Sequence, residues 1–317
     1  MKKLIVAGCV VAVVLASEGR QPTEWERFDY MKDVTRVPHA AKVPFRLGVA
    51  RWTYHTVAKE YNGLAKVLES MRKVDCHYLG LISKTLSYDA SDAEIAQYKA
   101  FLASYGVETV TLGPDEVSAD EAEARRIFEF AKRFGMKTVS LLPCEKKTID
   151  GKEVDVESEA ALDVVEKLVK EYDIRVAIHN HGPDMPNLYP TAEAIWKRIE
   201  KRDARIGFCF DIGHQYRAGH DPVAAIRKYG KRIYDVHLKN IKSHPVCNLA
   251  TPGPRGELEI PQILQALADV GYDGVCHIEY ERDFDDPTLG LAESMGYYRG
   301  VMDMLSPNSL EGNAASR

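Results

Sequence analysis

The sequence lacks the features that mark several other classes of protein. Its six cysteines are scattered and include no Cys-x-x-Cys pair, so they give no disulfide framework. Acidic residues (47 Asp and Glu) outnumber basic ones (42 Lys and Arg), and the formal net charge of −5 argues against nucleic acid as a partner. Apart from a short stretch at the start, the chain has no long apolar run. What remains is a globular composition, 45% hydrophobic and 28% charged over 317 residues.

The chain begins with the pattern of an export signal. Two lysines precede thirteen apolar or small residues (4–16), and a polar stretch follows. A basic start, a short apolar region and a small residue before the polar sequence are typical of a secretory signal peptide. The run is shorter than the about 20 residues of a spanning helix, so we expect no stable membrane span. We predict a signal peptide over 1–16 and a periplasmic location. Lipidation at Cys9 and a buried N-terminal helix are less favoured.

Strand-like and helical stretches alternate along most of the remaining chain. Residues 17–44 are predicted to form a polar lead and residues 307–317 a flexible tail. Strand-like runs occupy 45–50, 77–82, 108–112, 138–142, 175–178, 205–210, 232–238 and 274–280. Amphipathic helical stretches occupy 58–71, 92–105, 119–134, 157–172, 191–199, 222–229, 261–270 and 291–305.

Eight such units in about 260 residues are typical of a closed barrel of parallel strands. We therefore predict an α/β fold, a single-domain (β/α)8 TIM barrel over residues 45–306. A doubly wound Rossmann sheet is the alternative. The absence of Gly-x-Gly-x-x-Gly after the first strand argues against it.

Histidine is concentrated in the last four strands. Seven of the ten histidines lie between residues 179 and 277. In these strands one of the two alternating residue sets is apolar, and we expect it to face the helices. The other set is polar, and we expect it to face the barrel axis near the carboxyl ends of the strands, where TIM barrels build active sites. Its members are His179, His181, Asp211, Asp235, His237, Lys239, His277 and Glu279.

Four of these side chains form a candidate metal site: His179, Asp211, His237 and Glu279. Two imidazoles and two carboxylates from four consecutive strand ends suit one divalent metal ion. Mixed nitrogen and oxygen ligation favours manganese, cobalt, zinc or iron over calcium. A buried polar network without metal is the alternative interpretation.

Further residues near the predicted site are candidates for catalysis or substrate binding. His214 lies three residues after Asp211, while Lys84 and Lys239 follow the second and seventh strands. Buried lysines with a lowered pKa can act as acid or base, although solvated lysines are common near loops. We take His214, Lys84, Lys239 and Glu279 as catalytic candidates. The candidates for substrate contact are His181, Arg255, Trp52 and His55.

These motifs resemble the xylose isomerase-like TIM barrels, the sugar phosphate isomerase/epimerase superfamily. The resemblance covers roughly residues 45–306. It rests on four stretches in the family's order: Val176–Gly182, Phe210–His214, Asp235–Asn240 and His277–Tyr280. It implies a divalent metal ion held after strands five to eight, with Asp211, His237 and Glu279 as ligands. It also implies that His214 contacts the substrate.

One position departs from the pattern of the ketose epimerases in this family. Many of them carry glutamate where this chain has His179, and a pair of glutamates there binds metal and moves protons. The substitution argues against two-base epimerisation. The string His179-Asn180-His181 resembles the inosose dehydratases instead, which eliminate water next to a ketone. The related DNA-repair endonucleases need three metals and extra histidines where this chain has Ser83-Lys84 and Gly113-Pro114, so we expect no nuclease.

Three hypotheses about function follow. The first is a metal-dependent sugar isomerase or epimerase that acts on a carbohydrate or keto-sugar through an enediolate. The second is a metal-dependent lyase or dehydratase that expels water or a glycosyl oxygen from a keto-sugar or keto-glycoside. The third is a sugar-binding barrel without catalysis. Each has a small-molecule carbohydrate as partner, and the predicted export favours extracytoplasmic carbohydrate processing.

Overall fold

The computed structural model describes residues 43–54, 61–81, 86–242 and 249–305. The predicted signal peptide, most of the polar lead and the tail lie outside the described residues. All described residues belong to the unit Pro38–Arg317. Among them, no helix combines the length and the apolar character that crossing a membrane requires.

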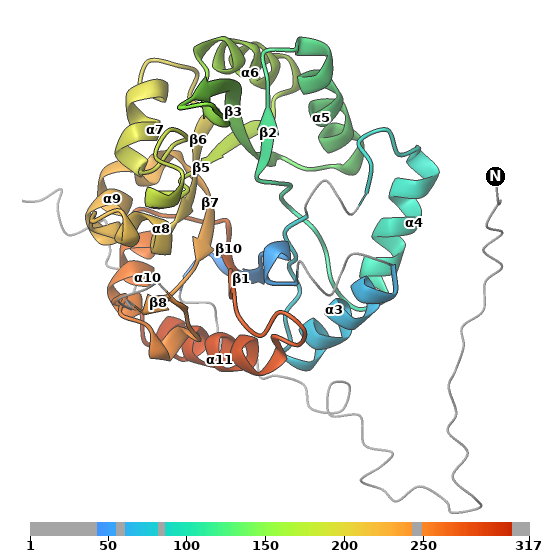
Figure 1. The fold of residues 1–317 in the computed structure, drawn as a ribbon. Helices are drawn as coiled ribbons and strands as arrows, with labels where there is room; N and C mark the ends of the chain where they lie inside the picture. The colour runs from blue at the N-terminus through green and yellow to red at the C-terminus, as the bar shows by residue number, and fades with distance from the viewer. Residues whose placement is uncertain (1–42, 55–60, 82–85, 243–248, 306–317) are drawn as a thin grey trace, which may run out of the picture. The chain divides into compact units, whose positions relative to one another are not determined.

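Parallel strands form a closed barrel, as predicted (Figure 1). The ring contains β1 (Arg46–Val49), β3 (Thr138–Ile149), β5 (Arg175–His179), β6 (Ile206–Asp211), β7 (Ile233–Leu238) and β10 (Val275–Ile278). Between β1 and β3, the two remaining predicted strands are present as isolated parallel bridges, Val49 with Leu79, Tyr78 with Glu108 and Leu81 with Leu112. Because β1 also pairs with β10, the ring closes.

Helices cover the outside of this barrel (Figure 1). They are α3 (Tyr61–Lys73), α4 (Asp92–Ala103), α5 (Glu121–Phe134), α6 (Glu159–Tyr172), α7 (Ala192–Ile199), α8 (Ile212–Arg217), α9 (Pro222–Tyr229), α10 (Ile260–Asp269) and α11 (Thr288–Met304). Each predicted helical stretch is represented, and α8 is an additional short helix directly after β6. Its N-cap is Asp211, whose side chain accepts a hydrogen bond from the backbone of His214.

Several short elements complete the fold. They are the 3-10 turns η1 (Arg51–Tyr54), η3 (Gly182–Asp184), η4 (Gly230–Arg232) and η5 (Gly253–Arg255), the strand β2 (Asp115–Val117), and the small antiparallel pair β8 (Ile241–Lys242) and β9 (Leu249–Ala250). Among these, η1 directly follows β1 and η3 lies shortly after β5. Both contribute residues to a cavity of the barrel that is described below.

The largest difference from the prediction is a hairpin after the fourth strand of the barrel. β3 continues to Ile149 and pairs antiparallel with β4 (Lys152–Glu157). The turn between them is Asp150-Gly151, and both residues have positive φ, 51° and 75°. An Asp-Gly pair between two strands is a strong hairpin signal, which the search for helical periodicity passed over.

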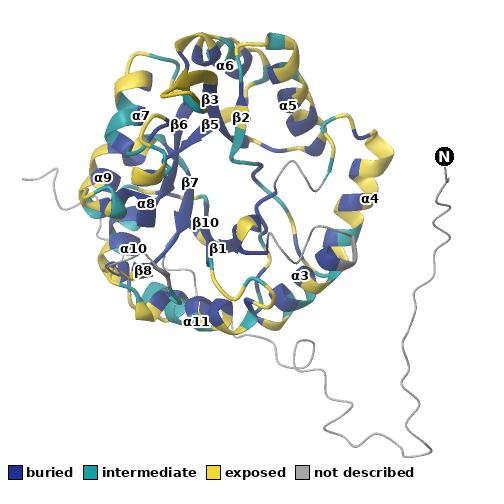
Figure 2. Ribbon diagram, in the orientation of Figure 1, coloured by how far each residue is buried: buried dark blue, intermediate teal, exposed yellow. Residues whose placement is uncertain are grey.

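The side chains of the strands alternate as the sequence predicts. Phe208 of β6 points outward, because its ring stacks on Trp196 of α7 at 13° and lies 5.3 Å from the ring of Tyr229 in α9. Figure 2 shows that strands and the inner faces of helices are buried. The polar set therefore occupies the inside of the barrel.

Candidate active site

The carboxyl ends of β5, β6, β7 and β10 bring the four predicted metal ligands together. His179, Asp211, His237 and Glu279 each offer a ligand atom, and these atoms lie within 4.8 Å of one another. Asp211 is fully buried and the other three are at most 6% exposed. The sequence-based grouping of these residues into one cluster is therefore correct.

The cluster has two buried atoms that lack hydrogen-bond partners among the described residues. They are Nε2 of His179 and Oδ2 of Asp211, which lie 3.7 Å apart. An unsatisfied buried polar group costs about 1–3 kcal/mol, and a cation between these two atoms would satisfy both. Beside them, Nδ1 of His237 lies 2.6 Å from Oε2 of Glu279. The residues present thus fit a divalent metal ion.

The residue directly after β5 holds Asp211 in place. Asn180 donates a hydrogen bond from Nδ2 to the backbone oxygen of Asp211 and accepts one at Oδ1 from its backbone N–H, each 2.9 Å long. Oδ1 of Asp211 accepts from the backbone N–H of His214 at 2.7 Å. With Oδ1 committed to α8, Oδ2 is the oxygen directed to the cluster.

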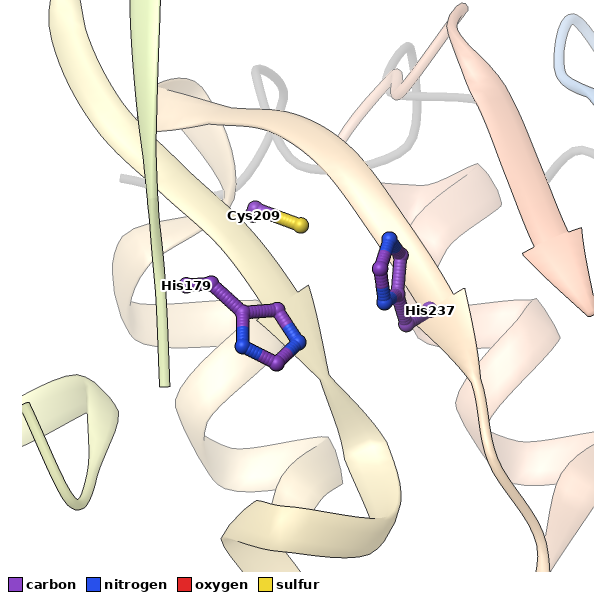
Figure 3. A group of neighbouring side chains, drawn as sticks. All are labelled: His179, Cys209 and His237. Atoms are coloured by element: carbon purple, nitrogen blue, oxygen red, sulfur yellow. The ribbon is translucent and has the colours of Figure 1, made fainter. Parts of the chain in front are cut away.

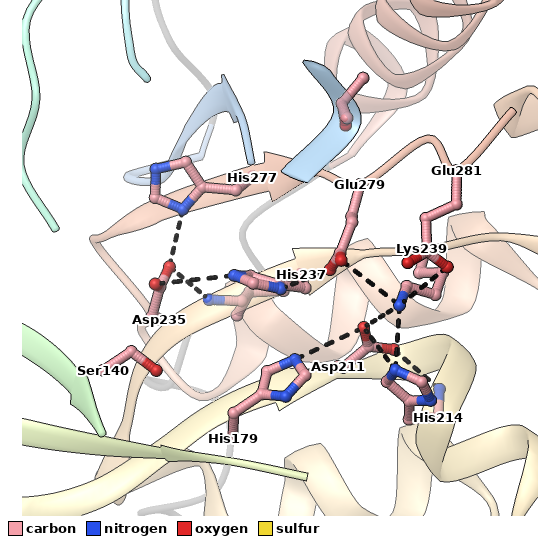
Figure 4. A network of polar contacts seen from close by, with 12 residues as sticks. Ser140, His179, Asp211, His214, Asp235, His237, Lys239, His277, Glu279 and Glu281 are labelled. Atoms are coloured by element: carbon pink, nitrogen blue, oxygen red, sulfur yellow. Dashed lines mark hydrogen bonds and ion pairs between the residues drawn. The ribbon is translucent and has the colours of Figure 1, made fainter. Parts of the chain in front are cut away.

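A second pair of polar side chains lies below the cluster, toward the amino ends of the strands. Nδ1 of His277 lies 2.8 Å from Oδ1 of Asp235, and the other oxygen of Asp235 lies 4.0 Å from Nε2 of His237 (Figure 4). Burial alone would raise the pKa of Asp235, but the two imidazoles outweigh it and lower that pKa. At 4.0 Å Asp235 makes no hydrogen bond to His237, so its effect on that histidine is electrostatic.

Lys239 carries a positive charge into the same site. Its Nζ lies 3.4 Å from Asp211, 3.4 Å from Glu279 and 3.2 Å from Glu281 (Figure 4). Burial would lower the pKa of Lys239, but the three carboxylates outweigh burial and raise it. The expectation of a lysine with a lowered pKa at this position is therefore wrong, because it took account of burial and not of the neighbouring acids.

The pKa values of the histidines of the site shift in different directions. Burial lowers the pKa of His179, His181 and His214, which favours their neutral forms. At His237 burial acts in the same sense, but contacts with Cys209 and Glu279 outweigh it and raise the pKa. Neutral imidazoles are the form that binds metal ions.

The cluster opens into a cavity of about 600 Å³. Of the predicted contacts, His181, His214, Lys239, Glu279 and Trp52 line it, and Trp52 is 43% exposed. Arg51, Thr111 and Asp115 of the first half of the barrel line it as well.

The other predicted site residues do not join this cavity in the described structure. Arg255 on η5 is not among the cavity's lining residues, and its Nε donates to Glu293 at 2.7 Å. Lys84 and His55 lie outside the described residues. Their predicted roles stay predictions.

Sequence reasoning also missed Glu281 and Arg217, two polar residues that line the cavity beside the predicted site. Glu281 contacts Lys239. It could have been predicted from the sequence, because it continues the alternation of polar residues that runs from His277 to Glu279. Arg217 points NH1 toward Nδ1 of His214 at 3.2 Å and also pairs with Asp184. Arg217 lies three residues after His214, a spacing that places both on one face of a helix. The sequence did not predict the helix α8, so this spacing could not be used.

Comparisons with known proteins point to one family. The family described as xylose isomerase-like TIM barrel matches residues 68–301. A rhizopine catabolism protein of Rhizobium meliloti is 28% identical over 155 residues, 44% of this chain and 46% of that protein. An inosose dehydratase of Clostridium tetani is 30% identical over 156 residues, 44% of this chain and 51% of that protein. The chain thus spans about half the length of these curated relatives.

Solved structures share the fold. A xylose isomerase-like TIM barrel protein from Mycobacterium smegmatis in complex with magnesium has a TM-score of 0.63 and 17% identity, covering 82% of this chain and 97% of that one. An L-ribulose 3-epimerase has a TM-score of 0.60 and 17% identity, covering 81% and 94%. At this level of identity the likeness shows the fold alone.

Proposed function

Given that the chain belongs to the xylose isomerase-like TIM barrel family, we propose that it is a metal-dependent enzyme acting on a keto-sugar. It removes the proton beside the carbonyl to give an enediolate and then expels the β-hydroxyl as water, which makes it a carbon–oxygen lyase. The observation that carries the proposal is the buried cluster in which Nε2 of His179 has no hydrogen-bond partner and lies 3.7 Å from Oδ2 of Asp211, which is ion-paired with Lys239 at 3.4 Å; these two atoms fit a cation. The inosose dehydratase among the relatives supports elimination as the outcome.

The metal ion would be held by His179, Asp211, His237 and Glu279. It supplies Lewis acidity, which draws electron density from the substrate carbonyl and makes the neighbouring proton easier to remove. Manganese, cobalt, zinc and iron all suit this donor set. The magnesium complex of the Mycobacterium smegmatis protein supports a divalent ion in this type of site.

Lys239 and Glu281 carry out the proton transfers. Glu281 is the carboxylate beside Lys239 that the four-ligand set leaves free, and both side chains line the cavity. Glu281 accepts the proton beside the carbonyl, and the Lys239 ammonium donates one to the departing hydroxyl oxygen. General acid–base catalysis of this kind contributes about 10²–10⁴-fold to a rate.

His181 positions the substrate as a hydrogen-bond donor. With Nε2 of His179 directed at the cation, its Nδ1 carries the hydrogen and donates to Nδ1 of His181, 3.3 Å away. The neutral His181 then presents Nε2–H to the cavity. Trp52 supplies an aromatic wall for the sugar.

An isomerase or epimerase is the second candidate. Position 179 is histidine and not glutamate, but Glu279 and Glu281 both line the cavity. Two carboxylates are therefore available for the two proton transfers of an epimerisation. In that reaction the enediolate takes the proton back at another carbon or face, and no water is lost.

Incubation with Mn²⁺ and an inosose or a panel of ketohexoses in D₂O separates these candidates. A dehydrated product supports the lyase. Deuterium on a carbon of the intact sugar, with no dehydrated product, supports the isomerase or epimerase and contradicts elimination. Binding without product or exchange contradicts both and leaves a sugar-binding barrel. Glu281→Gln is the matched control, because it should abolish exchange and leave metal binding in place.

We also propose that the protein is exported, with residues 1–16 removed. The support is the basic and then apolar pattern at the start of the chain. The N-terminal residue of the protein from the periplasmic fraction tests this. A mature chain that still begins at Met1 in the cytoplasm contradicts it.

A further inference from the structure

A cysteine lies directly beneath the proposed metal site. Cys209 is fully buried on β6, two residues before Asp211, and its side chain is therefore on the same face of the strand. Because β6 runs between β5 and β7, Cys209 pairs with His179 on one side and with Asp235 on the other, two residues before His237. Figure 3 shows its sulfur pointing toward His237.

The three side chains form a second set of possible ligands. Sγ of Cys209 and ring nitrogens of His179 and His237 lie within 4.8 Å of one another. The unpartnered Nε2 of His179, which is 2% exposed, is an independent sign that the cluster is incomplete without a ligand. This second set shares both histidines with the set that includes Asp211 and Glu279.

We propose that Cys209 is a metal ligand, and that it makes the barrel select between two kinds of divalent ion. Thiophilic ions, zinc and cobalt, are held by Cys209 with His179 and His237. Magnesium and manganese are held through Asp211 and Glu279, because carboxylates suit harder ions and thiolates softer ones. The shared histidines allow one ion at a time. The inference rests on the proposed metal site and adds a ligand to it.

Binding to Cys209 releases a proton. The thiolate, not the thiol, is the form of cysteine that binds a metal ion. When zinc binds, the S–H bond breaks, a Zn–S bond forms, and the proton passes to the buffer. No oxidant or reductant is needed.

Cobalt reports the sulfur bond directly. The full chain loaded with Co²⁺ is expected to show the near-ultraviolet charge-transfer absorption of a cobalt–thiolate bond. Cys209→Ser should lose this absorption. Cys276→Ser is the matched control, since Cys276 is equally buried on β10 but alternates with His277 and Glu279 and so faces the helices. The proposal is overturned if the wild type lacks the absorption or if Cys209→Ser retains it.

Calorimetry gives a second readout, which does not depend on activity. We expect Cys209→Ser to bind Zn²⁺ about 10–100-fold more weakly, and to release about one proton fewer per ion in buffers of different ionisation enthalpy. Its affinity for Mn²⁺ should stay within about threefold of wild type. Unchanged zinc affinity and proton release contradict the proposal. Cys209→Ala replaces the serine variant if the latter has lost its circular dichroism.

Failure of this inference can be told from failure of the proposed function. If Asp211→Asn abolishes Mn²⁺ binding and turnover while Cys209→Ser leaves zinc binding unchanged, the metal-dependent enzyme stands and the thiolate ligand does not. If the wild type binds none of these ions, both fail.

Discussion

The half of the barrel from β5 to β10 differs from the half between β1 and β3 in the regularity of its strands. β5, β6, β7 and β10 pair in parallel ladders, with one register shift between Phe208 and Cys209 where β6 meets β7. In the first half, Leu79, Glu108 and Leu112 take part only in isolated bridges. Three of the proposed metal ligands lie in these ladders and Glu279 directly follows β10, while the looser half supplies cavity walls such as Trp52 and Asp115. Metal ligation needs atoms fixed to within fractions of an ångström, whereas a sugar-contacting wall tolerates adjustment.

The largest expected effect comes from removing a ligand in the regular half. Asp211→Asn keeps an N-cap for α8 but loses the charge of Oδ2, so we expect Mn²⁺ affinity to fall at least about 100-fold. Saturating Mn²⁺ stabilises the wild type by about 2.7 kcal/mol at 100 times its Kd, and the variant should show no such gain. Thermal unfolding with and without Mn²⁺ measures this. Equal stabilisation of both proteins would contradict the assignment of Asp211.

A substitution at Lys239 tests whether the half of the barrel from β5 to β10 also provides the general acid. Lys239→Met keeps most of the length of the side chain and removes the ammonium. We expect kcat to fall about 10²–10⁴-fold while Mn²⁺ still binds. Steady-state kinetics and calorimetry on one preparation give both values. A kcat close to that of the wild type would exclude Lys239 from the proton transfers.

A substitution at Trp52 tests whether the half of the barrel between β1 and β3 contacts the substrate without taking part in the chemistry. Trp52→Ala should raise KM by about tenfold, because loss of an aromatic contact is worth about 0.5–1.5 kcal/mol, and leave kcat nearly unchanged. Metal affinity should not change. A large fall in kcat at normal KM would mean that the first half takes part in chemistry.

The smallest effect is expected at the hairpin, which lies outside both sets of site residues. Gly151 has φ of 75° and open space around the position of a Cβ, so Gly151→Ala costs only backbone energy, about 1–2 kcal/mol. Urea unfolding measures this loss. Turnover and Mn²⁺ affinity should stay at wild-type levels, and a change in either would connect the hairpin to the site.

Strand alternation in the sequence predicted which residues lie together in the site, but not the contacts between side chains of different strands. His179, Asp211, His237 and Glu279 were grouped correctly because alternation and strand order place strand ends together. The pKa of Lys239 was predicted wrongly because the prediction counted burial and not the charges of Asp211, Glu279 and Glu281, which together raise it. Asp235 and His277 were assigned to the inside of the barrel, but their pairing needed the register of β7 and β10.

The most direct test of the central claim is anomalous diffraction from crystals soaked in Mn²⁺. We expect one manganese peak about 2.0–2.3 Å from Nε2 of His179, Oδ2 of Asp211, His237 and Glu279. Saturating Mn²⁺ with no peak at these four residues, or with the ion bound only elsewhere, would contradict it.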